Sequence, residues 1–195
     1  MNSSGPVIQT LERQRAIATV VAAFSADPLV RWIYPDAAQY LNAFPRIVEA
    51  FGGGAFDAGS AYSFADPVAV ALWLGPGVES DGEAMGGIMA ETVGEHLMLD
   101  LGGFTEQMAA FHPHEPHWYL PLIGVDPAYQ GRGLGSVLMA HGLTVSDKAG
   151  LPAYLEATSE GSRRLYERHG FVTLGEIQSG ASPAIWPMRR EPRSR

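Results

Sequence analysis

The chain has 195 residues, of which 46% are hydrophobic and 17% charged, and this composition predicts one compact globular domain over residues 1–195. Its formal net charge of −8 argues against non-specific nucleic-acid binding, and the absence of cysteine excludes disulfides, thiolate metal sites and a cysteine nucleophile. The first residues lack the pattern of a secretory signal, and no apolar run reaches the roughly 20 residues that cross a bilayer. We therefore expect a cytoplasmic protein without membrane contact.

The first half of the chain reads as short strands and amphipathic helices. Residues 7–11 are a candidate strand, and residues 14–26 show helical spacing of apolar side chains that ends at Asp27-Pro28. A second helix is predicted over 37–51, with a kink or break at Pro45 and a stop at the following glycines. Residues 68–74 are apolar on both faces, which is typical of a buried central strand.

The second half alternates strands with helices. Residues 83–92 and 98–111 look helical and lie within an inserted cap region, 78–116, that separates two strands. The remaining predicted elements are strands at 118–125, 153–157, 171–177 and 184–188, and helices at 134–149 and 162–169. This alternation indicates an α/β protein whose sheet is covered on both faces.

A glycine-rich loop follows the strand at 118–125 and opens directly into a helix. Gly131, Gly133 and Gly135 remove side chains, so the unpaired N–H groups of the first helical turn can close on an anion, and Arg132 can add a charged contact. The loop lacks the lysine of a P-loop, and its third glycine falls one position early for a dinucleotide-binding fingerprint. The predicted ligand is a phosphate or pyrophosphate, and the alternative is a plain glycine-rich turn.

Two sequence strings decide between these readings. VDPAYQGRGLGS, residues 125–136, resembles the Q/R-x-x-G-x-G/A signature of the GNAT N-acetyltransferase superfamily. LEATSEGSRRLYERHGF, residues 155–171, resembles that family's second signature, in the expected order and at the expected separation. A looser likeness to puromycin-type acetyltransferases lies in residues 26–36 and 69–76. The resemblance implies a GNAT fold, a mixed and mostly antiparallel sheet flanked by helices and splayed at the central strand around 118–125.

The same resemblance implies acetyl-CoA as co-substrate and assigns the residues that hold it. Strand residues would pair with the pantetheine, the loop would hold the pyrophosphate, and the Val125 N–H would polarise the acetyl carbonyl. Gly124 fits a bulge or a close approach of another backbone, and a glycine that relieves packing is the alternative. The implied cofactor-binding residues are Ile123, Gly124, Val125, Gln130, Gly131, Arg132, Gly133, Leu134, Gly135, Ser136 and Ser162.

The second signature contains two residues, Tyr166 and Ser162, with a possible chemical role. Tyr166 matches the family's general acid, which would protonate the departing thiolate, and the alternative is an ordinary core aromatic. Ser162 stands where the family often has Asn, so its cofactor contact is lost, bridged by water or replaced by Arg163. Ser162 is also a candidate helix cap.

The general base is sought in the segment H-P-H-E-P-H, residues 112–117. Glu115 and His117 are the candidates for accepting a proton through water, and His117 and Tyr119 are expected on the same strand face as Pro121. A His/Glu cluster also suggests a metal, but this one is held open by prolines and lacks a second ligand set, so no metal is expected. Surface histidines are the alternative reading.

The resemblance therefore implies an N-acetyltransferase that transfers acetyl from acetyl-CoA to the primary amine of a small molecule. The transfer would be direct, in a ternary complex. Aromatic residues of the first helices are candidates for the acceptor pocket: Trp32, Tyr34, Tyr40, Phe51 and Phe56. The alternatives are a catalytically silent acyl-CoA-binding module and an enzyme that acetylates protein lysines or N-termini. A homodimer is an assembly that the resemblance also implies.

Overall fold

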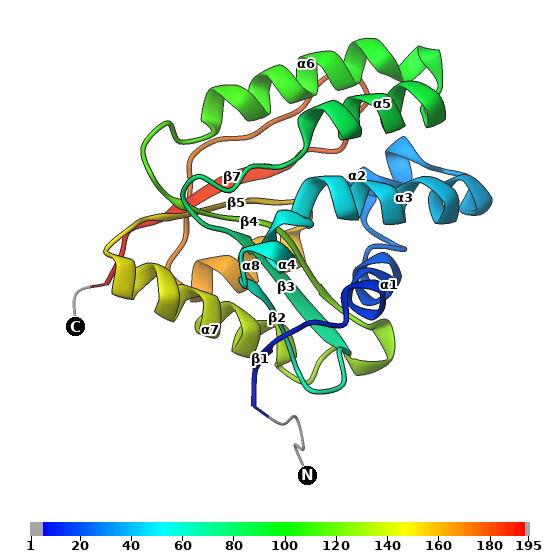
Figure 1. Cartoon of the computed structure of the whole chain (residues 1–195). Coiled ribbons are helices and arrows are strands. Elements are labelled where there is room, and N and C mark those ends of the chain that lie inside the picture. The colour runs from blue at the N-terminus through cyan, green and yellow to red at the C-terminus, as the bar shows by residue number, and fades with distance from the viewer. Residues whose placement is uncertain (1–5, 194–195) are drawn as a thin grey trace.

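The computed structural model describes residues 6–193, which form one seven-stranded sheet with helices on both faces (Figure 1). The strand order is β1-β2-β3-β4-β5-β7-β6, and all neighbours are antiparallel except the parallel pair β4 and β5. The strands are β1 (Ile8–Gln9), β2 (Ala61–Ser63), β3 (Ala69–Leu74), β4 (Trp118–Val125), β5 (Ala153–Ala157), β6 (Val172–Thr173) and β7 (Trp186–Arg190). The predicted mixed, mostly antiparallel sheet is confirmed.

Two groups of helices cover the two faces of this sheet. The helices are α1 (Arg13–Ala23), α2 (Pro28–Ile33), α3 (Ala37–Gly52), α4 (Gly54–Asp57), α5 (Gly82–Thr92), α6 (Glu95–Phe111), α7 (Leu134–Ala149) and α8 (Glu160–Arg168), with a short 3₁₀ turn at Pro127–Tyr129. One apolar core joins β3 and β4 to α1, α3, α5 and α6, and a second joins the other sheet face to α7 and α8. Every residue of β3 is buried, as its unbroken apolar run predicts.

The strands β4 and β5 separate soon after they begin. Their pairing consists of Trp118 with Ala153 and Tyr119 with Tyr154, and beyond these pairs the two strands diverge. A register shift against β3 places one extra residue of β4 between Tyr119 and Leu122, which is a β-bulge at Leu120-Pro121. Pro121 has no N–H to donate, which suits a position where pairing is interrupted. The predicted splay at this strand is confirmed.

The bulge corrects one prediction about side-chain direction. Tyr119 and Leu122, three residues apart, both pack in the core beneath α1 and α3, whereas Leu120 packs on the opposite face. Simple alternation, which would place Tyr119 and Pro121 on the same face, is broken by the extra residue.

Several local predictions in the first half also differ from the structure. The helix α1 ends at Ala23, three residues before the predicted end. Asp27 instead accepts a hydrogen bond from the Val30 N–H at 3.1 Å and caps α2, a helix that the sequence did not predict. The helix α3 continues through Pro45, because the carbonyl of Leu41 that loses its partner lies on the exposed side of the helix. The short β2 was also missed, since three residues show no clear periodicity.

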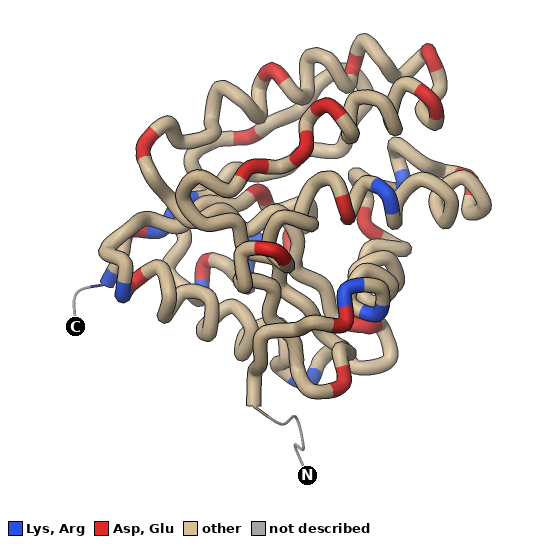
Figure 2. The backbone as a smooth tube through the Cα atoms, in the orientation of Figure 1, with Lys and Arg blue, Asp and Glu red and all other residues tan. Residues whose placement is uncertain are grey.

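The segment between β3 and β4 folds into the helices α5 and α6, close to their predicted bounds. Figure 2 shows Asp and Glu, and neither Lys nor Arg, along both helices. Residues 78–116 contain eight acidic residues and no basic one, so this segment alone carries a charge equal to the net charge of the whole chain. Within residues 6–193, no helix is long and apolar enough to cross a membrane.

Candidate active site

The glycine loop connects the end of β4 to the start of α7. Gly131 and Gly133 have φ values of 75° and 79°, in the left-handed region that favours glycine, and Gly133 is the N-cap of α7. Gln130 folds back and donates from Nε2 to the Val125 carbonyl at 3.1 Å. The backbone N–H groups of the first turn of α7 are therefore presented beside a loop without side chains, the arrangement that binds phosphate oxygens.

A cleft of about 480 Å³ opens at this loop and extends between the diverging strands. Ten of the eleven predicted cofactor-binding residues line it, together with Tyr166: Ile123, Gly124, Val125, Gln130, Gly131, Gly133, Leu134, Gly135, Ser136 and Ser162. We call it the loop cleft. Arg132 is the exception, because its guanidinium donates to the Ala128 carbonyl at 3.2 Å and lies over the ring of Tyr129.

Gly124 lies in the loop cleft at a regular position of the β3–β4 ladder, paired with Val70, and outside the bulge. A Cβ atom placed on Gly124 would lie 2.7 Å from the Cβ of Ala23 in α1. The glycine is therefore explained by the close approach of the helix to the strand, which is one of the two readings of the sequence.

Tyr166 stands in the last turn of α8, lines the loop cleft and is 6% exposed. Burial raises the pKa of its phenol well above the usual value, and the negative charges of Asp27 and Glu156 raise it further. The phenol is therefore protonated throughout the neutral range, as a proton donor must be. Asp27 also lines this cleft, and burial raises the pKa of its carboxyl while a hydrogen bond from Thr158 opposes the shift.

Two serines of the loop cleft are held by local hydrogen bonds. Ser159 and Ser162 form a capping box at the start of α8, in which the Ser162 N–H donates to Ser159 Oγ at 3.2 Å and the Ser159 N–H donates to Ser162 Oγ at 3.2 Å. Ser162 therefore takes part in capping α8 as the N3 residue of the box, while Ser159 is the N-cap itself. Ser136 Oγ lies 2.7 Å from His169 Nε2, which links the start of α7 to the end of α8.

The two predicted base candidates lie at the other end of β4. Glu115 forms an ion pair with Arg189. A hydrogen bond from its own backbone N–H, and then the contact with Arg189, lower the pKa of its carboxyl. His117 Nδ1 lies 2.8 Å from the Glu115 carbonyl oxygen, and its Nε2 lies 3.2 Å from His112 Nε2. Within residues 6–193, no group of three or more His, Asp or Glu side chains is placed to hold a metal ion.

These residues line a second cleft, of about 610 Å³, which we call the carboxylate cleft after the side chain at its floor. That side chain is Glu156 of β5, which sequence reasoning missed. Its Oε2 accepts a hydrogen bond from the Tyr119 hydroxyl at 2.9 Å, and burial raises the pKa of the carboxyl to about 7. Glu156 stands between the apolar residues Leu155 and Ala157 of β5. An acidic residue inside a strand that is predicted to be buried is the sequence signal that could have identified it.

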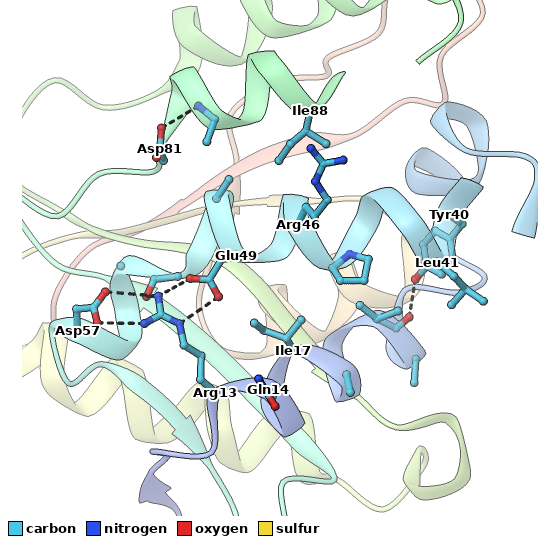
Figure 3. A pocket seen from close by; sticks show the side chains of 18 of the residues that line it. Arg13, Gln14, Ile17, Tyr40, Leu41, Arg46, Glu49, Asp57, Asp81 and Ile88 are labelled. Atoms are coloured by element: carbon cyan, nitrogen blue, oxygen red, sulfur yellow. Dashed lines mark hydrogen bonds and ion pairs between the residues drawn. The ribbon is translucent and has the colours of Figure 1, made fainter. Parts of the chain in front are cut away.

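A third and larger cavity, of about 1120 Å³, lies between α1, α3 and α5 (Figure 3). Figure 3 shows Arg13 pointing toward Glu49 and Asp57, with which it forms ion pairs. Of the aromatic acceptor candidates, Tyr40 lines this groove and Phe51 lines the carboxylate cleft.

The splayed sheet, the glycine loop and the cleft between them define the acyltransferase class of α/β proteins. The family model described as Acetyltransferase (GNAT) family matches residues 40–171, and the chain belongs to that family.

Curated relatives support this assignment over part of the chain. A mycothiol acetyltransferase of Acidothermus cellulolyticus is 35% identical over 100 residues, which are 50% of this chain and 29% of that protein. A mycothiol acetyltransferase of Gordonia bronchialis is 32% identical over 104 residues, 50% of this chain and 33% of that protein. The matched segment thus spans a third or less of the curated relatives.

Solved structures match the whole fold. A Corynebacterium glutamicum protein, described as histone acetyltransferase HPA2 and related acetyltransferase, has a TM-score of 0.67 and 27% identity, covering 98% of each chain. A polyamine N-acetyltransferase of Drosophila melanogaster has a TM-score of 0.59 and 18% identity, covering 95% of this chain and 99% of that one. At 18% identity the likeness shows the fold alone.

Proposed function

We propose that this protein is an acetyl-CoA-dependent N-acetyltransferase that transfers acetyl to a primary amine by direct attack in a ternary complex. The observation that supports the proposal is that ten of the predicted cofactor-binding residues line one cleft together with Tyr166. Membership of the GNAT family supports acetyl-CoA as the co-substrate.

The residues of the loop cleft fit the parts of acetyl-CoA. The N–H groups of the loop and of the first turn of α7 would hold the pyrophosphate. The edge of β4 that faces β5 is unpaired beyond Tyr119, so Ile123 to Val125 offer backbone groups to the pantetheine amides. Tyr166 would donate its proton to the thiolate as the carbon–sulfur bond breaks. Because the chain has no cysteine, a thioester-linked enzyme intermediate is excluded.

We propose a small molecule as the acceptor. The relatives described above are all named as acetyltransferases, but their names point to different acceptors. Cavities of 300–1,000 Å³ are usual for small-molecule ligands, and the carboxylate cleft lies in this range. The homodimer that the resemblance implies stays a prediction, which light scattering would test. The cytoplasmic location expected from the sequence also stays a prediction, which fractionation would test.

The test is thiol release from acetyl-CoA with a panel of small amines, arylamines, aminoglycosides and lysine peptides. We expect acceptor-dependent turnover in the wild type and a loss of at least about 100-fold in Tyr166→Phe, with acetyl-CoA affinity kept. Tyr62→Phe is the matched control, because Tyr62 is also a buried tyrosine but packs beside α7, outside the loop cleft.

Three other outcomes would redirect the proposal. Tight acetyl-CoA binding without turnover on any acceptor would favour a silent acyl-CoA-binding module. Turnover on lysine peptides alone would favour a protein acetyltransferase. Equal turnover in the wild type and Tyr166→Phe would remove Tyr166 from the mechanism.

A further inference from the structure

The loop cleft and the carboxylate cleft approach each other where β4 and β5 diverge. The loop cleft reaches Ile123 and Tyr166 from the carboxyl end of β4, and the carboxylate cleft reaches Tyr119 and Glu156 from its amino end. The two clefts share no lining residue, but Glu156 of the carboxylate cleft stands two residues before Thr158 of the loop cleft, at the strand that diverges from β4. A thioester entering by the first cleft and an amine entering by the second would therefore meet between a buried phenol and a buried carboxyl.

Glu156 is incompletely satisfied by the protein. Its Oε2 accepts the hydrogen bond from Tyr119, but its Oε1 is shielded from solvent and has no hydrogen-bond partner among the described residues. The hydroxyl of the adjacent Tyr154 is also shielded. It lies near enough to Glu156 for a hydrogen bond between them to oppose the rise of the Glu156 pKa, but the contact does not meet hydrogen-bond geometry. Buried polar atoms are nearly always paired, and an exception calls for an explanation such as a missing ligand. An N–H group entering the carboxylate cleft would supply the partner.

The charged groups around Glu156 favour a cation. The titratable groups that face it are the phenols of Tyr119, Tyr154 and Tyr166 and the imidazoles of His112 and His117. Burial and the neighbouring histidines lower the pKa of His112, so this ring is neutral at pH 7. Two acidic residues, Glu79 and Glu115, line the cleft, and no Lys or Arg does so in the described chain. Arg189 pairs with Glu115 from outside the lining, so Glu79 is the rim carboxylate that has no ion pair among the described residues.

The wall of the carboxylate cleft belongs largely to the acidic segment 78–116. That segment contributes eight negative charges, while the rest of the chain carries equal numbers of acidic and basic residues. The excess negative charge of the protein therefore lies in the segment that forms much of this wall (Figure 2), and two of its acidic residues, Glu79 and Glu115, line the cleft itself. Clefts with charge of one sign raise the local concentration of oppositely charged ligands.

We propose that Glu156 is the group that accepts the proton of the acceptor, and that the carboxylate cleft admits small primary amines carrying a second positive charge. This inference rests on the proposed acetyl transfer and deepens it. It replaces Glu115, whose carboxylate is engaged by Arg189, as the first candidate for the base.

The proposed sequence of proton transfers is balanced. Glu156 takes one proton from the ammonium, and the nitrogen lone pair then forms a bond to the thioester carbon. The carbon–sulfur bond breaks, and Tyr166 gives its proton to the sulfur. The surplus proton of the new amide nitrogen restores Tyr166, and Glu156 releases its proton to water, so each turnover yields one amide, one thiol and one proton.

The first experiment compares the pH dependence of kcat/KM in the wild type, Glu156→Gln and Glu115→Gln, with 1,4-diaminobutane as acceptor. The glutamine can still accept from Tyr119, and acetyl-CoA affinity reports whether the variant is folded. We expect the wild-type rate to rise with pH through about 7. Glu156→Gln should lose this rise and at least about 100-fold of turnover at unchanged acetyl-CoA affinity. A rise that persists in Glu156→Gln, or that is lost only in Glu115→Gln, would overturn the assignment.

A second comparison tests the acceptor class with butylamine as the matched monocation. We expect a KM at least about tenfold lower for 1,4-diaminobutane, with an advantage that shrinks at high salt because exposed charges are screened. Equal KM values for the two amines would overturn the requirement for a second charge while leaving acetyl transfer intact.

The failure of the proposed function is distinguishable from the failure of this inference. If the wild type acetylates no amine in the panel, the proposed function fails. In that case, binding of 1,4-diaminobutane is measured by NMR from the ¹³C resonance of the Glu156 carboxyl. That resonance is assigned as the one that disappears in Glu156→Gln. A resonance that titrates near pH 7 and shifts on adding the diamine would support the site, and one that does neither would overturn it.

Discussion

The two ends of β4 perform their proposed tasks with different parts of the chain. At the carboxyl end, the contiguous residues 123–136 supply half of the residues that line the loop cleft, and four of these are glycines that offer only their backbone. At the amino end, the carboxylate cleft is assembled from α3, the turn after β3, the end of α6 and β5, and its chemistry comes from side chains. Recognition by backbone leaves a contiguous pattern of glycines in the sequence, whereas recognition by side chains drawn together from distant segments leaves none.

This difference also concerns charge. The loop cleft offers N–H groups and a helix N-terminus to an anion, while the carboxylate cleft offers a carboxylate and an acidic wall to a cation. The two clefts therefore differ in the groups that line them, and the proposed mechanism assigns the anionic cofactor to one and the cationic acceptor to the other.

The largest effect is expected at the amino end of β4, where Glu156 should make the free energy of unfolding depend on pH. Its pKa in the folded protein is about 7, above the ordinary value of 4.5, so the folded state binds the extra proton between these two values. The associated stability is fully present below about pH 4.5 and is lost as pH rises through 7. Glu156→Gln removes this loss, and we expect its free energy of unfolding to rise relative to the wild type by up to about 3 kcal/mol between pH 4.5 and pH 8.

Urea unfolding of both proteins across this range is the measurement. Glu91→Gln is a useful control, because its contact with Arg46 lowers the pKa of Glu91, so the associated stability is lost as pH falls. A difference between Glu156→Gln and the wild type that does not change with pH would show that Glu156 is not a desolvated carboxyl.

A smaller effect is expected at the carboxyl end of β4, from Arg132→Ala. The guanidinium is engaged by Ala128 and Tyr129 and lies outside the cleft lining, so the backbone holds most of the anion. We expect acetyl-CoA affinity to fall by less than about fivefold, which corresponds to about 1 kcal/mol. A fall of 100-fold in titration calorimetry would show that the side chain, rather than the backbone, holds the pyrophosphate.

Much of the second half of the fold was predictable because its signals are local. The bounds of β4, α7 and β5 agree with the sequence prediction residue for residue, since glycines punctuate the loop and helix and the strands are buried apolar runs. In the first half, α2 was missed because Asp27-Pro28, which was read only as a stop, also starts a helix. The bulge at Pro121 depends on pairing with β3 and leaves no periodic signal.

The candidate site divides in the same way. The residues of the loop and Tyr166 could be named from contiguous signatures, and the structure brings all but Arg132 to one cleft. Glu156 stands inside the second signature, but its significance depends on Tyr119 and on the divergence of β5 from β4. Burial and pairing of this kind are tertiary properties, so the sequence drew attention to the more conspicuous Glu115 and His117 instead.

The central claim, that the glycine loop holds acetyl-CoA, is tested most directly by two glycine substitutions at opposite ends of α7. Gly133 and Gly150 both have left-handed φ values, 79° and 66°, and an added Cβ meets no atom within 4 Å at either position. Gly133→Ala and Gly150→Ala should therefore cost similar strain, about 1 kcal/mol each.

Only the Cβ at Gly133 would occupy the space of the bound pyrophosphate. In titration calorimetry with acetyl-CoA, we expect Gly133→Ala to bind at least about tenfold more weakly than the wild type, which is about 1.4 kcal/mol, and Gly150→Ala to bind like the wild type. Equal weakening by both substitutions, or no binding of acetyl-CoA to the wild type, would contradict the account.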